Sequence, residues 1–82
     1  MRVNEVFETM SNEATAVVMT IGEDGYYVCK YKKDLINDKY IIKEVGDRTV
    51  THLGVTRTSR GFGIVIQCVI NKDNEVTEND KN

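Results

Sequence analysis

The sequence is poor in the residues that form most recognisable sites. Its 82 residues include no proline, no tryptophan, one histidine and two cysteines. Two cysteines are too few for a disulfide scaffold, and one histidine without a Cys-x-x-Cys pair does not make a zinc site. No G-x-S-x-G, P-loop, H-E-x-x-H or EF-hand pattern is present. We therefore expect a non-enzymatic protein that holds neither a metal nor a cofactor.

Long apolar segments are also absent. No apolar run approaches the roughly 20 residues of a membrane-spanning helix, and the first residues turn acidic at Glu5, unlike a secretory signal. We expect a cytoplasmic protein without membrane contact, in which Cys29 and Cys68 are free, reduced and buried. A chain of this length excludes a TIM barrel or a full dinucleotide-binding fold. It predicts one domain, residues 1–71, and a disordered polar tail, residues 72–82.

The first residues predict a short amphipathic helix over about residues 3–12. Apolar residues recur there at spacings of three and four, namely Val3, Val6, Phe7 and Met10. A helix of this length is unstable alone, so it is expected to lie on the rest of the protein.

From Ala14 onward the pattern changes to short runs rich in β-branched residues, separated by turn residues. The predicted strands are residues 14–21, 26–32, 40–45, 48–55 and 64–70. Gly46-Asp47 is interpreted as a hairpin turn, residues 33–38 as a loop that could include one helical turn, and residues 56–63 as a polar loop. The predicted fold class is mainly β with a minor α part. It consists of the N-terminal helix and a five-stranded antiparallel meander, as a curled sheet or a small barrel.

The first and last predicted strands lack clean alternation. Residues 17–19 are all apolar, and so are residues 64–66, which indicates burial on both faces of these strands. One short helix cannot cover both faces of five strands. Either barrel closure or a second copy of the chain would supply the remaining cover. We favour a homodimer, because small domains often complete their cores in this way.

The net charge of −2 conceals an uneven distribution. Residues 1–25 carry one basic and five acidic residues, residues 26–60 eight basic and four acidic, and residues 61–82 two basic and four acidic. The middle of the chain is therefore basic. It is interpreted either as a surface for an acidic partner or as the ordinary solvated face of a sheet.

Residues 56–63 form the first candidate binding segment. Arg60-Gly61-Phe62-Gly63 resembles the start of the signature strand of RNA-recognition-motif domains, whose aromatic side chains stack on bases. Beyond this short match, Ile64 and Gln67 stand where that signature has aromatic residues. That family also needs a further helix and strand, whereas only a polar segment follows here. The chain is therefore not assigned to the family.

Two arginines in this segment are candidates on their own chemistry. Arg57 and Arg60 could bind phosphate or carboxylate through their guanidinium groups, with Phe62 beside them. Gly61 and Gly63 would let backbone amides approach a ligand. A solvated hairpin loop that uses its glycines only for turn geometry explains the same residues.

The second candidate cluster interleaves tyrosine with lysine, and its binding candidates are Tyr27, Lys30, Tyr31 and Lys32. Alternation places Tyr27, Cys29 and Tyr31 on one face of a strand. Such residues stack on bases, form the centre of a protein contact, or pack as cross-strand pairs. His52 has no patterned nucleophile or carboxylate beside it and is interpreted as structural.

These features favour a small protein that binds another protein through its sheet surface and residues 56–63. The proline-free composition, rich in Asn, Asp and Lys, is similar to that of accessory proteins of phages or mobile elements, which often inhibit a host protein. The alternative is a nucleic-acid or nucleotide binder that uses the basic segment 30–60. Its affinity would fall steeply with salt.

Overall fold

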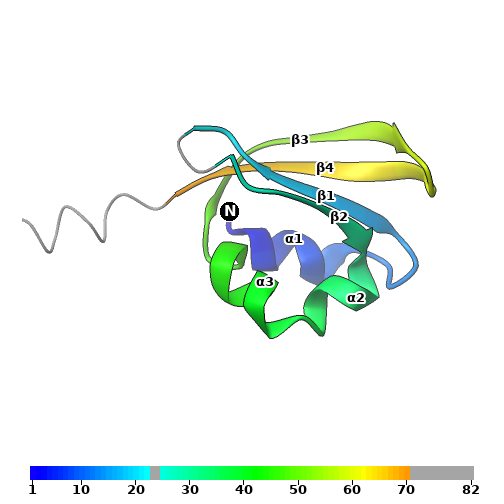
Figure 1. Ribbon diagram of the computed structural model, residues 1–82, viewed down its shortest axis with the longest axis horizontal. Coiled ribbons are helices and arrows are strands. Elements are labelled where there is room, and N and C mark those ends of the chain that lie inside the picture. Colours follow the sequence, from blue (N-terminus) through cyan, green and yellow to red (C-terminus); the bar gives the residue numbers. More distant parts are fainter. Residues whose placement is uncertain (23–24, 71–82) are drawn as a thin grey trace, which may run out of the picture.

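The computed structural model describes residues 1–22 and 25–70. In chain order the elements are α1 (Val3–Thr9), β1 (Thr15–Thr20), β2 (Tyr27–Tyr31), α2 (Lys32–Ile36), α3 (Lys39–Val45), β3 (Thr49–Thr58) and β4 (Gly61–Val69). The described fold is thus mostly β, as the sequence predicted, with a few short helices. These helices lie together on one face of the sheet, and its other face carries no described helix (Figure 1).

The sheet has four strands in the order β2-β1-β4-β3. The β1–β2 and β3–β4 hairpins are antiparallel, whereas the central strands β1 and β4 run parallel. The predicted five-stranded antiparallel meander is therefore wrong, and the sheet is not closed into a barrel. The reason is the connection between β2 and β3, which lie at opposite edges. Helices α2 and α3 carry the chain across one face of the sheet between them.

The predicted third strand, residues 40–45, is instead helix α3. The Asp38 carboxylate caps this helix, because its Oδ1 accepts hydrogen bonds from the backbone N–H of Tyr40 at 3.0 Å and of Ile41 at 3.2 Å. Ile41 and Val45, four positions apart, are both buried on one side of the helix. A short apolar run is compatible with either structure, and the cap and the burial spacing decide it here.

Two smaller expectations are also corrected. Helix α1 ends at Thr9, three residues before the predicted end, although Met10 is still buried. Residues 33–38, where one helical turn was allowed, contain most of the short helix α2, which buries Leu35 completely. Gly46 caps the end of α3 and does not form a hairpin turn. The start of α1 contacts this end of α3, since the backbone N–H of Asn4 donates to the Gly46 carbonyl at 2.9 Å.

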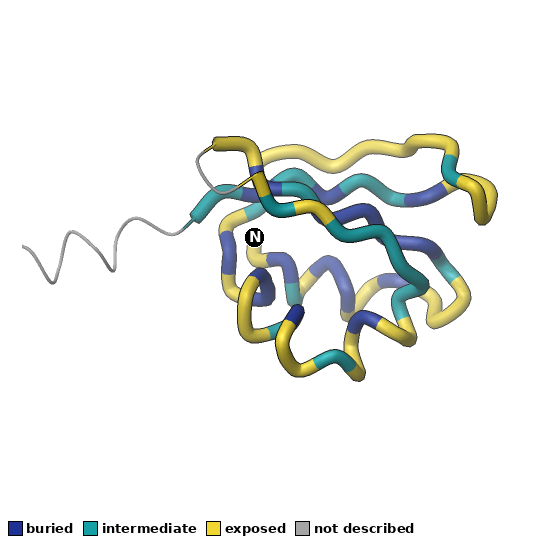
Figure 2. Tube along the Cα trace, viewed as in Figure 1, coloured by how far each residue is buried: buried dark blue, intermediate teal, exposed yellow. Residues whose placement is uncertain are grey.

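The core lies between the sheet and the helices (Figure 2). Its buried residues are Val3, Val6, Phe7, Met10, Ala16, Val18, Leu35, Ile41, Val45, Ile66 and Cys68. Val17 points to the opposite face from Val18, yet only 3% of it is exposed. Two-sided burial is therefore confirmed for β1. In β4, Ile66 is fully buried while Ile64 and Val65 are half-buried.

The predicted loop 56–63 is mostly strand. β3 continues to Thr58 and β4 begins at Gly61, so only Ser59 and Arg60 form the turn. Gly61 has a φ of +98°, in the left-handed region that favours glycine. The Thr58 hydroxyl donates to the Gly61 carbonyl and accepts from Arg60 N. Gly61 therefore serves the turn geometry, and the segment is a tight hairpin.

Two points concern the predicted tail and membrane spans. The predicted disordered tail, residues 72–82, lies outside the described residues. Among the residues that are described, none of the helices has the length and apolar character needed to cross a membrane.

Candidate functional site

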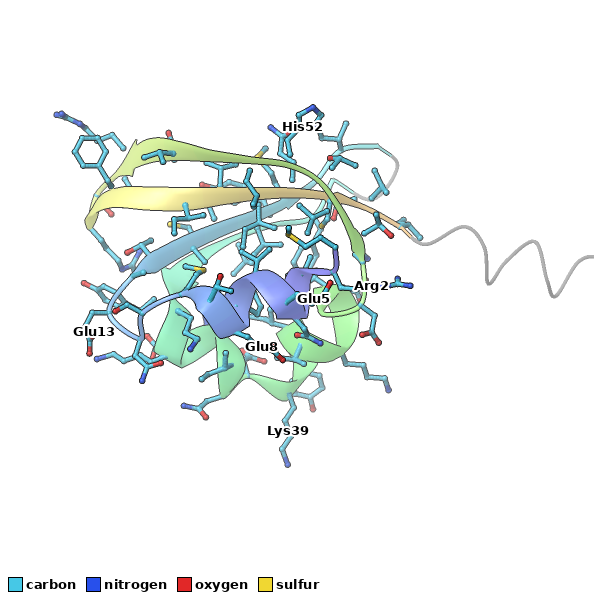
Figure 3. All side chains as sticks on the ribbon, turned by 180° about the vertical axis from the view of Figure 1, so that it is seen from behind. Arg2, Glu5, Glu8, Glu13, Lys39 and His52 are labelled. Carbon is cyan, nitrogen blue, oxygen red and sulfur yellow. The ribbon has the colours of Figure 1, made fainter. Side chains whose placement is uncertain are left out.

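The sheet face opposite the helices is called the open face here. By strand register its residues are Tyr27, Cys29 and Tyr31 of β2, Thr15, Val17 and Met19 of β1, Gly63, Val65 and Gln67 of β4, and His52, Gly54 and Thr56 of β3. Figure 3 shows His52 pointing away from the helices, whereas Lys39 lies at the far side of the helical layer. The predicted alternation that puts both tyrosines on one face is confirmed, because both lie in this set.

Arg60 joins the two segments that the sequence singled out separately. Its guanidinium carbon lies 5.3 Å from the centre of the Tyr31 ring, and its Nη1 lies 4.0 Å from Cys29 Sγ. Lys33 contributes a second cation, with its Nζ 5.7 Å from the same ring centre. Cations at these distances are attracted to the ring face. The β3–β4 turn is thereby held against β2, although β1 and β4 lie between β2 and β3 in the sheet.

Gly63 lies two strands away from Tyr31, since Thr15 pairs with both residues, and it allows close packing. A Cβ at Gly63 would lie 3.1 Å from Thr58 Cγ2 and 3.4 Å from Thr15 Cγ2. The glycine therefore lets neighbouring strands carry threonine side chains at that end of the open face. In this structure its role is packing between strands.

Arg57 and Phe62 form a second pair of a cation and an aromatic ring. They face each other across β3 and β4, with 5.4 Å between the guanidinium carbon and the ring centre. Phe62 is 69% exposed. Alternation along β3 groups Arg57 with Leu53 and Val55 and separates it from the open-face residues. The two arginine–aromatic pairs therefore belong to different sides of the hairpin.

The lysines of the predicted tyrosine–lysine cluster do not join the open face. Lys30 Nζ lies 3.9 Å from Asp38 Oδ2, at the start of α3. Lys32 is the first residue of α2, and its Nζ donates to Asn12 Oδ1 at 3.1 Å. Alternation in β2 sends Lys30 to the side opposite Tyr31. The structure thus separates the tyrosines from Lys30 and Lys32.

The basic middle segment is not one continuous surface, because Arg48 points inward. It is 7% exposed, and its guanidinium donates 2.5 Å hydrogen bonds to Thr20 Oγ1 and Glu44 Oε2. It also lies 5.7 Å from the centre of the Tyr26 ring. These contacts join β1, α3 and the start of β3. Sequence reasoning counted Arg48 as a surface charge, and no local pattern marks it as buried.

The two cysteines lie on opposite faces of the sheet and are both free, as predicted. Cys29 is only half-buried on the open face of β2, so its predicted burial is wrong. Cys68 is fully buried in the core, with its Sγ 3.6 Å from Thr20 Oγ1. Strand β1 lies between their two strands. A disulfide between them would require the sheet to be rebuilt.

The two thiols are therefore expected to react at different rates. A thiol reagent such as dithionitrobenzoate should modify Cys29 in the folded protein and reach Cys68 only after denaturation, because reaction needs access to the sulfur. The measurement is the number of thiols titrated with and without guanidinium chloride. Cys29→Ser should abolish the native reaction. Native reaction of both thiols at equal rates would contradict this burial.

Two open hollows lie on the helical side of the protein. One, of about 340 Å³, is lined by Asn4, Phe7, Glu8, Lys32, Ile36 and Ile42. Another of about 340 Å³ lies between α1 and β3 and is lined by Met1, Glu5, Val6, Thr9 and Leu53. Across residues 1–22 and 25–70, no group of three or more His, Cys, Asp or Glu side chains is placed to hold a metal ion.

Comparison with known proteins finds no match for this chain, either among protein-family models or among curated proteins and solved structures.

Proposed function

We propose that the protein binds another protein through the open face of the sheet, with Arg60, Tyr31 and Tyr27 as the principal contacts. The observation that carries the proposal is the packing of Arg60 on Tyr31, 5.3 Å from its ring centre, at the hairpin end of this face. Arginine and tyrosine are enriched among the residues that dominate binding energy at protein interfaces. Tyr27, on the same face, is 63% exposed.

The chemistry of the open face supports a partner with carboxylates. The face carries apolar, aromatic and neutral polar side chains and includes no acidic residue. Within the described residues, no carboxylate forms an ion pair with Arg60. An acidic side chain of a partner could therefore accept hydrogen bonds from the guanidinium while apolar groups pack on Val17 and Val65.

In keeping with its composition, the protein would be an accessory protein of a phage or mobile element that inhibits a host factor. It would act as a homodimer, since the exposed apolar residues of β3 leave surface for a second copy of the chain.

The test is capture of a partner on the immobilised full-length chain from a bacterial lysate, followed by affinity measurement with the purified partner. Arg60→Ala is expected to weaken binding by roughly tenfold or more, because truncation of an interface arginine is often this costly. The thermal midpoint should change little, since the side chain is exposed. Tyr31→Ala should also weaken binding.

Lys39→Ala is the matched control, because it removes an exposed cation at the far side of the helical layer (Figure 3). It should leave the affinity unchanged. Equal affinities for wild type and Arg60→Ala would remove the hairpin end from the proposal.

A nucleic-acid binder is the second candidate, and one observation favours it. Residues 48–70 include no Asp or Glu, and this segment carries Arg57 paired with Phe62 and also Arg60, whose aromatic partner Tyr31 belongs to β2. Stacked aromatics beside arginines can bind single strands. Titration with single-stranded RNA and DNA at low and high salt discriminates, because phosphate contacts weaken steeply with ionic strength. The absence of binding at low salt would eliminate this candidate.

A further inference from the structure

The two edges of the sheet differ in how they are protected. The edge strand β2 has five residues, includes Lys30 and runs directly into α2. The edge strand β3 has ten residues, almost all exposed, with no lysine, proline or acidic residue (Figure 2). Natural edge strands are usually shortened, charged or covered, because their unpaired backbone groups pair readily with another strand. The β3 edge lacks most of these protections.

Only the start of the β3 edge is covered by the described residues. Arg2 forms an isolated bridge with Thr49, and Val50 N donates to the Met1 carbonyl at 2.8 Å. A β-bulge follows between Val50 and His52. The regular strand from His52 onward therefore presents an outer edge to solvent.

An exposed apolar strip accompanies this edge. Leu53 is 51% exposed and Val55 is 71% exposed. Both lie on the side of the sheet that carries the helices, since they face Ile66 and Ile64 across the β3–β4 ladder. Leu53 also lines the hollow beside α1, together with Met1 and Glu5. Unpaired backbone and exposed apolar side chains thus occur in the same few residues.

We infer that the β3 edge is the homodimer surface, on which a second copy of the chain pairs its own β3 in antiparallel register with Gly54 at the twofold axis. The inference deepens the proposed homodimer and is independent of binding at the open face. In this register Leu53 faces the second copy's Val55, and His52 faces its Thr56. A twofold repeats both pairs, so one sheet of eight strands forms.

The apolar pairing selects this register over its neighbours. Pairing must keep side chains on their own faces of the sheet, so the registers next to the one centred on Gly54 centre on Leu53 and on Val55. Centring on Leu53 would set Val55 against the second copy's Thr51, which lies in the bulge. Centring on Val55 would place Leu53 against the second copy's Arg57. Centring on Gly54 pairs apolar residues with each other. Within one chain a Cβ at Gly54 would meet nothing within 4 Å, so packing inside the chain does not require glycine there.

The distribution of charge along β3 suits a second copy as the occupant. The hairpin end carries Arg57 and Arg60, whereas at the other end of the β3 edge Glu5 lies beside Arg2, so charges of both signs occur there (Figure 3). Antiparallel pairing places the arginines of each copy beside this mixed end of the other copy and keeps the two hairpin ends apart. The two copies of Arg57 are then six positions apart along the strand, about 20 Å at 3.3 Å per residue, so they do not repel strongly.

The oligomeric state of the full chain tests this inference. Light scattering after size exclusion should give about 18.6 kDa, twice the 9.3 kDa chain. Val55→Lys and Leu53→Lys should each raise the dissociation constant of the dimer by roughly tenfold or more, because each places a cation in the apolar pairing. Circular dichroism should show retained folding, since both side chains are exposed. Tyr40→Lys, on an 87% exposed residue of α3, is the control and should leave the dimer intact.

Crosslinking tests the register. Directly facing strand residues have Cα atoms about 4.5–5.5 Å apart, within the range of a disulfide. In a Cys29→Ser background, Gly54→Cys should give a disulfide-linked dimer under oxidising conditions, whereas Thr56→Cys, which faces the second copy's His52, should not. The inference would be overturned if the wild type were monomeric, or if neither lysine substitution raised the dissociation constant of the dimer. Neither result depends on partner binding by Arg60, so failure here is distinguishable from failure of the proposed binding function.

Discussion

Ile66→Ala is expected to lower the free energy of unfolding by about 4 kcal/mol, because it deletes a completely buried side chain and leaves a cavity. Ile66 lies in the central strand β4, between β1 and β3, so the surrounding side chains have little freedom to fill that space. Domains of this kind have total stabilities of about 5–15 kcal/mol. A large fraction of the variant molecules should therefore be unfolded at modest urea concentrations. Urea titration followed by circular dichroism will measure this fraction.

Ile21→Ala is the matched control for this substitution. It removes the same atoms from a residue that is 55% exposed and lies just after β1. The expected loss is below about 1 kcal/mol, because most of the deleted surface is already in contact with water. Similar losses for the two variants would contradict the placement of Ile66 in the core.

Gly46→Ala is expected to destabilise the protein by about 2 kcal/mol through overpacking. A Cβ at this position would lie 2.6 Å from the Ile42 carbonyl oxygen and 2.7 Å from both polar side-chain atoms of Asn4. Its backbone φ of −57° is accessible to any residue, so the effect would come from space and not from backbone strain. Gly46 is where α3 ends against the start of α1, and thermal unfolding of the variant measures the loss.

A double-mutant cycle with Asn4→Ala separates the two sources of crowding. Asn4→Ala removes the side-chain obstruction, keeps the Asn4 N–H hydrogen bond to Gly46, and leaves the Ile42 carbonyl in place. Gly46→Ala should therefore be less destabilising by about 1 kcal/mol in the Asn4→Ala background. Additive losses would show that the Asn4 side chain does not crowd Gly46.

The candidate site was predictable only in part. The two-residue period of β2 places Tyr27 and Tyr31 together, and this prediction is confirmed by the register with β1. The contact between Arg60 and Tyr31 joins residues 29 positions apart, through a turn that the sequence alone read as a longer loop. Such a contact depends on which strands become neighbours. Local periodicity carries no information about that.

The sequence by itself determined the mostly β character, the N-terminal helix, the first hairpin and the free cysteines. These features follow from local spacing, turn residues and composition, which act over a few neighbouring positions. The tertiary structure decided that residues 39–45 form a helix, that β1 and β4 run parallel, and that Arg48 is buried. Each of these depends on burial against distant residues, and burial overrides a weak local preference wherever a short apolar run fits either a helix or a strand.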